Sequence, residues 1–132
     1  SNNELNLISE AGKENTLGSV ITGSWDLSKK GEGTWILSGA KTYGGATAIN
    51  AGTLKVSGSL SDSTAVSVSK RATYQVESGD TIVSIAGAGS IQIATGKTLS
   101  AGGLNTDTEV SGVISGDGGF TKVGTGTTTF SG

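Results

Sequence analysis

The sequence has no proline, cysteine, histidine or methionine, and it holds only two Trp, two Tyr and two Phe among 132 residues. Without cysteine and histidine the chain cannot form disulfides, thiolate or imidazole metal sites, or Ser–His and Cys–His pairs. Good helix formers follow no 3.6-residue period, so helical bundles and doubly wound folds are disfavoured. Acid–base chemistry in this chain would have to rely on its 11 carboxylates.

Charge of one sign and long apolar runs are also scarce. Nine basic and eleven acidic residues give a net charge of −2, which is too balanced for a nucleic-acid groove or a polybasic membrane patch. The apolar runs are far shorter than the roughly 20 residues that cross a bilayer. We therefore expect no nucleic-acid partner and no membrane insertion by this segment.

Small polar residues and β-branched residues dominate instead. Glycine occurs 23 times, and short runs alternate apolar with polar residues after a Gly or another turn former, as an all-β chain requires. The clearest predicted strands are residues 52–56, 65–68, 73–76, 89–93 and 98–100. A coiled solenoid and an antiparallel sandwich both satisfy this alternation, but Asp117-Gly118 is the only dipeptide typical of a tight hairpin turn.

An internal repeat is present at an offset of 93 residues. Residues 17–39 and 110–132 align without gaps and share nine identities in 23 positions, where composition predicts roughly two. Identical pairs include Val20-Ile21 with Val113-Ile114, and they continue with the glycines and lysines of a Lys-x-Gly-x-Gly-Thr pattern. With solenoid coils of roughly 20 to 25 residues, the offset predicts about four coils and the whole chain about six.

The residues from 27 onward carry a family resemblance. Residues 27–39 read LSKKGEGTWILSG and residues 41–56 read KTYGGATAINAGTLKV, which resembles the passenger-associated transport repeat of bacterial autotransporters. The resemblance identifies one full copy at residues 26–56 and a truncated second copy at residues 118–132. The sequence departs from the family pattern at Lys41, Gly44 and Thr128, so we expect looser packing at these positions.

The resemblance implies a right-handed parallel β-helix of about six coils, with residues 1–132 forming a single passenger segment. It further implies a structural stalk of a type V secreted protein, placed at the bacterial cell surface or released, that supports export across the outer membrane and displays adhesive or effector regions. The implied partner is a C-terminal translocator β-barrel of the same polypeptide, outside this sequence. The sequence starts without Met and stops within the second copy, so we expect a piece of a longer protein.

Two other functions stay open, namely an adhesin segment that itself binds host receptors or glycans, and the spacer of an autotransporter protease or toxin. An ordinary β-sandwich of unknown role is a further alternative. The exposed partner surface of an adhesin could include Trp25, whose counterpart in the second copy is Gly118. Trp35 and Tyr43 fall on repeat positions where we expect burial, and residues 1–16, less regular and more charged, are expected to shield one end.

No enzymatic activity, catalytic residue, cofactor or metal is predicted for this segment. Two carboxylate pairs are candidates for polysaccharide cleavage, Asp107 with Glu109 and Asp117 with Asp26, but neither has distinctive spacing. Residues 115–120, SGDGGF, resemble one turn of a calcium-binding nonapeptide without the tandem copies that supply enough oxygen ligands. Acidic residues beside glycine are more often solvated turn formers.

Overall fold

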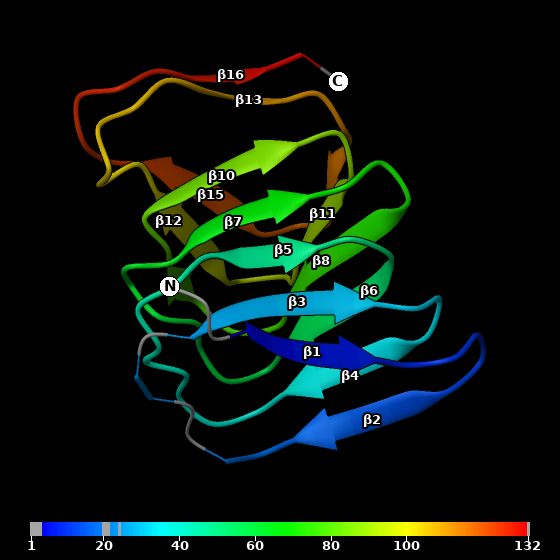
Figure 1. The fold of residues 1–132 in the computed structure, drawn as a ribbon. Coiled ribbons are helices and arrows are strands. Elements are labelled where there is room, and N and C mark those ends of the chain that lie inside the picture. Colours follow the sequence, from blue (N-terminus) through cyan, green and yellow to red (C-terminus); the bar gives the residue numbers. More distant parts are fainter. Residues whose placement is uncertain (1–3, 20–21, 24, 132) are drawn as a thin grey trace.

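The computed structural model describes residues 4–19, 22–23 and 25–131, and within them every regular element is a strand. All strand pairs are parallel, and strands adjacent in sequence belong to different sheets. Followed from its N-terminus in Figure 1, the chain winds upward as a right-handed coil. The predicted right-handed parallel β-helix of about six coils is confirmed, and no helix of membrane-spanning length and hydropathy occurs in the described ranges.

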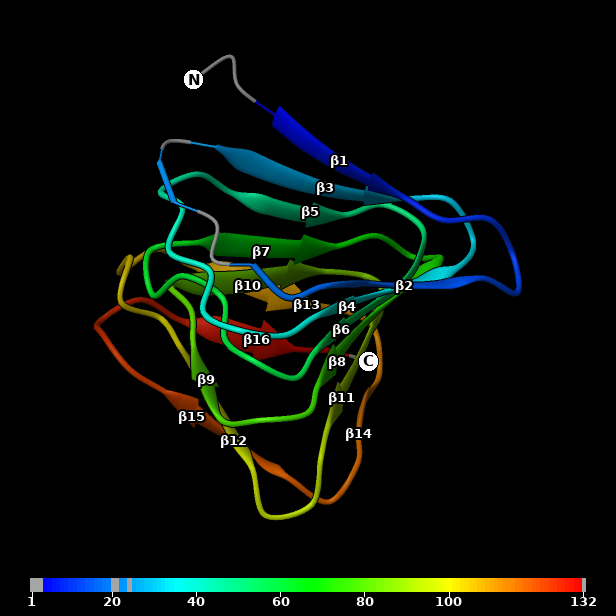
Figure 2. The same cartoon turned by 90° about the horizontal axis from the view of Figure 1, so that it is seen from below.

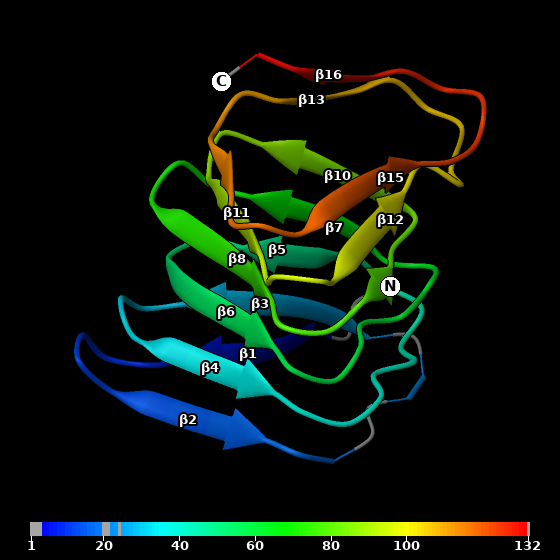
Figure 3. The ribbon, with the colours of Figure 1, turned by 180° about the vertical axis from the view of Figure 1, so that it is seen from behind.

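Three sheets form the sides of the solenoid, as the view along its axis shows (Figure 2). The first sheet has the order β1 (Glu4–Ile8), β3 (Asp26–Lys30), β5 (Thr47–Ile49), β7 (Ala65–Val68), β10 (Ser84–Gly87), β13 (Thr108–Val110) and β16 (Thr128–Phe130). The second, seen in front in Figure 3, holds β2 (Glu14–Leu17), β4 (Thr34–Leu37), β6 (Gly52–Val56), β8 (Ala72–Val76), β11 (Ser90–Ile93) and β14 (Ile114–Ser115). The third is shorter and holds β9 (Asp80–Thr81), β12 (Thr98–Ala101) and β15 (Gly119–Lys122).

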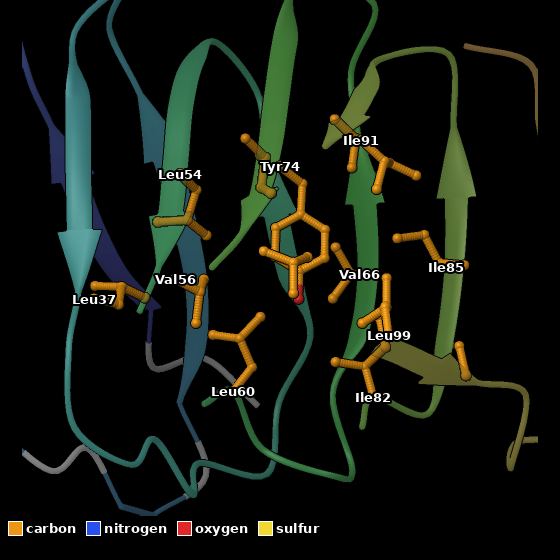
Figure 4. Close-up of a cluster of buried hydrophobic side chains, with 14 of the residues drawn as sticks. Leu37, Leu54, Val56, Leu60, Val66, Tyr74, Ile82, Ile85, Ile91 and Leu99 are labelled. Atoms are coloured by element: carbon orange, nitrogen blue, oxygen red, sulfur yellow. The ribbon is translucent and has the colours of Figure 1, made fainter. Parts of the chain in front are cut away.

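Period-2 alternation builds the core, because one face of each strand points into the solenoid. Residues 52–56 form β6 as predicted, with Leu54 and Val56 buried and Lys55 facing outward between them. Stacking in register puts like side chains above one another, so the interior is a column of aliphatic residues (Figure 4). The aliphatic members with no exposed surface are Leu37, Ile49, Leu54, Val76 and Leu99.

The 93-residue repeat does not span a whole number of coils. Pairings from Leu27 to Thr47, Val66 and Ile85 advance the chain by three coils, and the pairing of Gly87 with Val110 adds the fourth. These four coils contain 81 residues. An offset of 93 residues therefore equals four coils plus about one further side of the solenoid. The first copy accordingly begins in the first sheet with β3, whereas the second begins in the third sheet with β15. The repeat positions at Val20, Ile21 and Gly132 lie outside the described residues.

The described part of residues 1–16 lies at one end of the solenoid, where it forms a regular coil. Residues 4–17 supply β1 and β2, which pair with β3 and β4 as the first coil of the stack. Their regular alternation is weak because Asn15 points inward and Ile8 is 64% exposed. This first coil continues the solenoid.

Candidate functional site

The corner between β3 and β4, where the chain turns from the first sheet to the second, contains two glycines of the repeat. Gly31 has a φ of +79°, and a Cβ on it would lie 2.2 Å from the carbonyl oxygen of Ser9 in the preceding coil. A Cβ on Gly33 would lie 2.2 Å from the carbonyl oxygen of Glu10. The two glycines of the Lys-x-Gly-x-Gly-Thr pattern are therefore required by close coil-to-coil contact.

Lys29 occupies the interior of this corner. It stands between Leu7 and Ile49 in an inward column and is fully buried. Its Nζ donates to the carbonyl oxygens of Lys30 at 2.8 Å, Gly31 at 2.9 Å and Ala51 at 3.1 Å. Desolvation lowers the pKa of Lys29, while the nearby Glu32 carboxylate raises it. The ammonium thus binds its own corner to the corner of the next coil.

Lys41 makes a second contact of this kind. It is 1% exposed, and its Nζ donates to the carbonyl oxygen of Ser19 at 2.6 Å and to that of Ser38. Burial lowers the pKa of Lys41. The looser packing expected at Lys41 is therefore wrong, since its side chain joins two coils from inside.

The second copy of the pattern builds the same kind of corner on another side of the solenoid. Lys122 Nζ donates to the carbonyl oxygen of Val123 at 2.6 Å, as Lys29 does to Lys30. Gly124 has a φ of +78°, and a Cβ on it would lie 2.2 Å from the carbonyl oxygen of Gly102. The shared residues therefore encode a local corner that is independent of the sheet in which it begins.

Three of the candidate carboxylates, Asp26, Asp107 and Glu109, make hydrogen bonds between neighbouring coils. Asp26 Oδ1 accepts a hydrogen bond from the backbone N–H of Ala46, and Asp107 Oδ1 accepts one from that of Thr127, both at 2.9 Å. These two aspartates lie four coils apart just before or at the start of strands of the first sheet. Glu109 Oε2 accepts a hydrogen bond from Ser131 Oγ at 2.6 Å. Each of these carboxylates therefore contacts the next coil.

Asp117 and Asp26 are not brought together by the fold. Asp117 lies between β14 and β15, four coils beyond Asp26, which corresponds to about 19 Å along the axis at about 4.8 Å per coil. Asp117 is exposed and accepts a 3.4 Å hydrogen bond from Thr95 Oγ1. In the part of the chain that the structure describes, no cluster of three carboxylates suited to a metal and no pocket is found.

Tyr43 and Trp35 are buried or partly buried as expected, whereas Trp25 is exposed. Tyr43 is buried with its hydroxyl 2.5 Å from Thr47 Oγ1, and Trp35 packs half-buried against the core. Trp25 is 39% exposed at the corner before β3, where its ring lies against Gly23. Trp25 is therefore the aromatic side chain most accessible to a ligand among the described tryptophans and tyrosines.

A buried carboxyl, Asp80, was not anticipated from the sequence. It opens β9 and is 8% exposed, with Oδ2 accepting the N–H of Leu60 at 2.9 Å and Oδ1 accepting that of Thr81 at 2.8 Å. Its position after Ser78-Gly79 is typical of a solvated turn, although Asp80 precedes the buried Ile82 by two residues and so shares an inward face with it. The strand register agrees with an interior position, because Asp80 pairs with the buried Leu99.

Comparisons with known proteins agree with the repeat. The model of the passenger-associated-transport-repeat family matches residues 27–56. The adhesin BmaC autotransporter of Brucella suis biovar 1 (strain 1330) is 50% identical over 42 residues, which cover 32% of this chain but 1% of that protein. No solved structure matches the chain. The chain is therefore a parallel β-solenoid in which residues 27–56 match the passenger-associated transport repeat, and a 42-residue stretch is similar to an autotransporter adhesin.

Proposed function

We propose that this segment is a structural stalk of a type V secreted surface protein, supporting export across the outer membrane and displaying other regions of the protein. The observation that carries the proposal is the continuous stack of parallel coils, joined by an apolar column and by lysines that bind neighbouring coils from inside. The partner that this role requires is a translocator on the same polypeptide, and the location is the cell surface or the medium. On this proposal the segment itself is not an enzyme.

Stacked coils suit export for a thermodynamic reason. The stability of a solenoid is approximately a sum of coil terms and nearest-neighbour interface terms, so folding can propagate coil by coil as chain emerges. Each added coil buries apolar side chains against its neighbour, as Leu54 packs between the register partners Trp35 and Tyr74. Withdrawal of the chain would require unfolding these coils, so stacking opposes it.

Strand β6 offers a matched test of this role. In the full-length protein, Leu54→Asp with Val56→Asp places two carboxylates in the core, whereas Lys55→Asp changes the outward residue between them. We expect the double variant to reach the cell surface more slowly, because buried unpaired charge costs several kcal/mol and prevents the coil from stacking. Surface display of Lys55→Asp should match the wild type. Equal display kinetics for all three proteins would refute the role in export.

A second candidate function, adhesion by this segment itself, is favoured by Trp25. An exposed indole combines flat apolar area with a hydrogen-bond donor, which suits glycan and receptor surfaces. Binding of the purified chain to host cells or glycans should then be lost in Trp25→Ala with no change in the unfolding midpoint. Unchanged binding by the variant would exclude Trp25 as the contact.

A further inference from the structure

Polar side chains gather inside the solenoid at the third and fourth coils. The Tyr43 hydroxyl lies 2.5 Å from Thr47 Oγ1, which lies 2.7 Å from Thr64 Oγ1. Thr64 Oγ1 in turn donates to the carbonyl oxygen of Gly45 at 2.9 Å. Tyr43, Thr47 and Thr64 are all fully buried, so this chain of hydroxyl groups is shielded from water.

Asp80 completes the cluster from the third sheet. Its register partner in the next coil is Leu99, and the register partner of Leu99 is Phe120, so the carboxyl stands in an otherwise apolar column. Both carboxyl oxygens accept backbone N–H groups, from Leu60 and Thr81. A carboxyl in this position is held in place but poorly solvated.

Tyr74 adds a second buried phenol hydroxyl near Asp80. Its ring projects from β8 into the aliphatic interior (Figure 4), and its hydroxyl oxygen is buried with no hydrogen bond of normal geometry. Burial raises the pKa of Tyr74, and the charges of Asp80 and Tyr43 raise it further. The Tyr74 hydroxyl is therefore a neutral group that stands beside the carboxyl and interacts with it only weakly.

The groups that act on Asp80 are acidic or neutral. They are the Asp62 carboxylate from the turn before β7, the Tyr74 hydroxyl from β8, and the two backbone N–H groups. Burial, together with the Asp62 carboxylate, raises the pKa of Asp80, whereas hydrogen bonds from the N–H groups of Leu60 and Thr81 and from the Tyr74 hydroxyl lower it, and the resulting pKa is about 6. Among the described residues, no cationic group acts on the carboxyl to hold it ionised.

We propose that Asp80, together with the surrounding Tyr and Thr hydroxyl groups, forms a proton-binding switch that stabilises the middle coils in mildly acidic medium and loosens them at neutral pH. A carboxyl proton removes an uncompensated charge from the apolar column. Loss of that proton leaves a carboxylate in the interior, which favours local opening of the fourth coil. This switch is independent of the proposed role in export.

The direction of the pH dependence follows from proton linkage. The folded chain binds the Asp80 proton more tightly than the unfolded chain, whose Asp pKa is about 3.9. The stabilisation is therefore present at acidic pH and is lost as the pH rises through about 6. Between pH 5 and pH 7.5 this predicts about a tenfold fall in the folding equilibrium constant, or about 1.4 kcal/mol.

Urea unfolding at pH 5 and pH 7.5 tests the switch, with Asp80→Asn and Asp107→Asn as matched variants. Asp107 also accepts a backbone N–H at 2.9 Å, but it is exposed. We expect the tenfold fall in the wild type and in Asp107→Asn, and its loss in Asp80→Asn. The same fall in Asp80→Asn, or none in the wild type, would overturn the proposal.

A direct titration keeps the proposal testable where Asp80→Asn fails to fold. In the wild-type chain, carbon-13 NMR of the side-chain carboxyl reports the protonation of Asp80 itself. We expect a midpoint near pH 6 for Asp80. A midpoint near the ordinary Asp value of about 3.9 would show that no such switch exists.

Discussion

Replacing Lys29 with methionine removes the ammonium from the repeat corner while keeping a long apolar stem. Three carbonyl oxygens, of Lys30, Gly31 and Ala51, lose a charged donor, and each hydrogen bond to a charged group contributes about 1.5–3 kcal/mol. Removing a buried charge also relieves its desolvation, which offsets several kcal/mol. We therefore expect a net loss of about 2–4 kcal/mol in the free energy of unfolding.

Urea unfolding followed by circular dichroism measures this loss, with Lys30→Met as the control. Lys30 neighbours Lys29 on the same strand, but its side chain is exposed, so the control should stay within about 0.5 kcal/mol of the wild type. The reasoning would be refuted by a Lys29→Met protein as stable as the control. That result would mean that the carbonyl groups are satisfied equally well without the ammonium.

Glycine and aspartate substitutions test two other contacts between coils in the same assay. Gly31→Ala should cost at least about 3 kcal/mol, because the added Cβ meets backbone at 2.2 Å, whereas Gly12→Ala, with φ +78° and open space, should cost about 1 kcal/mol. Equal costs would contradict the close coil contact. Asp26→Ala and Asp107→Ala should each cost about 1 kcal/mol, since each loses one bond to the N–H of the next coil. A stability change in only one of them would contradict their equivalence.

Strand positions could be predicted from the sequence because alternation has a direct physical cause. Residues 52–56 and 65–68 coincide with β6 and β7, and residues 73–76 lie within β8. Alternation alone does not choose between parallel and antiparallel pairing, so the solenoid depended on the resemblance. The side on which a repeat begins could not be predicted, because coil length varies from 17 residues between Thr73 and Ser90 to 23 between Gly87 and Val110.

The interior polar residues were harder to predict. Lysine and aspartate are normally solvated, so Lys29 and Asp80 suggested surface positions. A signal existed for Lys29, since it follows Leu27 by two residues and therefore shares its inward face, and Lys122 repeats it. The same two-residue spacing holds for Lys41 before Tyr43 and for Asp80 before Ile82, but both polar residues follow glycine-containing turns, where a solvated position is expected.

Nuclear Overhauser contacts between backbone protons of neighbouring strands test the stack of parallel coils most directly. The account predicts in-register contacts between residues about 20 apart, such as Thr53 with Thr73 in the second sheet and Ala48 with Ser67 in the first. An antiparallel sandwich would instead give contacts between strands that follow each other in sequence, such as β5 with β6. Observation of that antiparallel pattern would contradict the solenoid and the stalk function built on it.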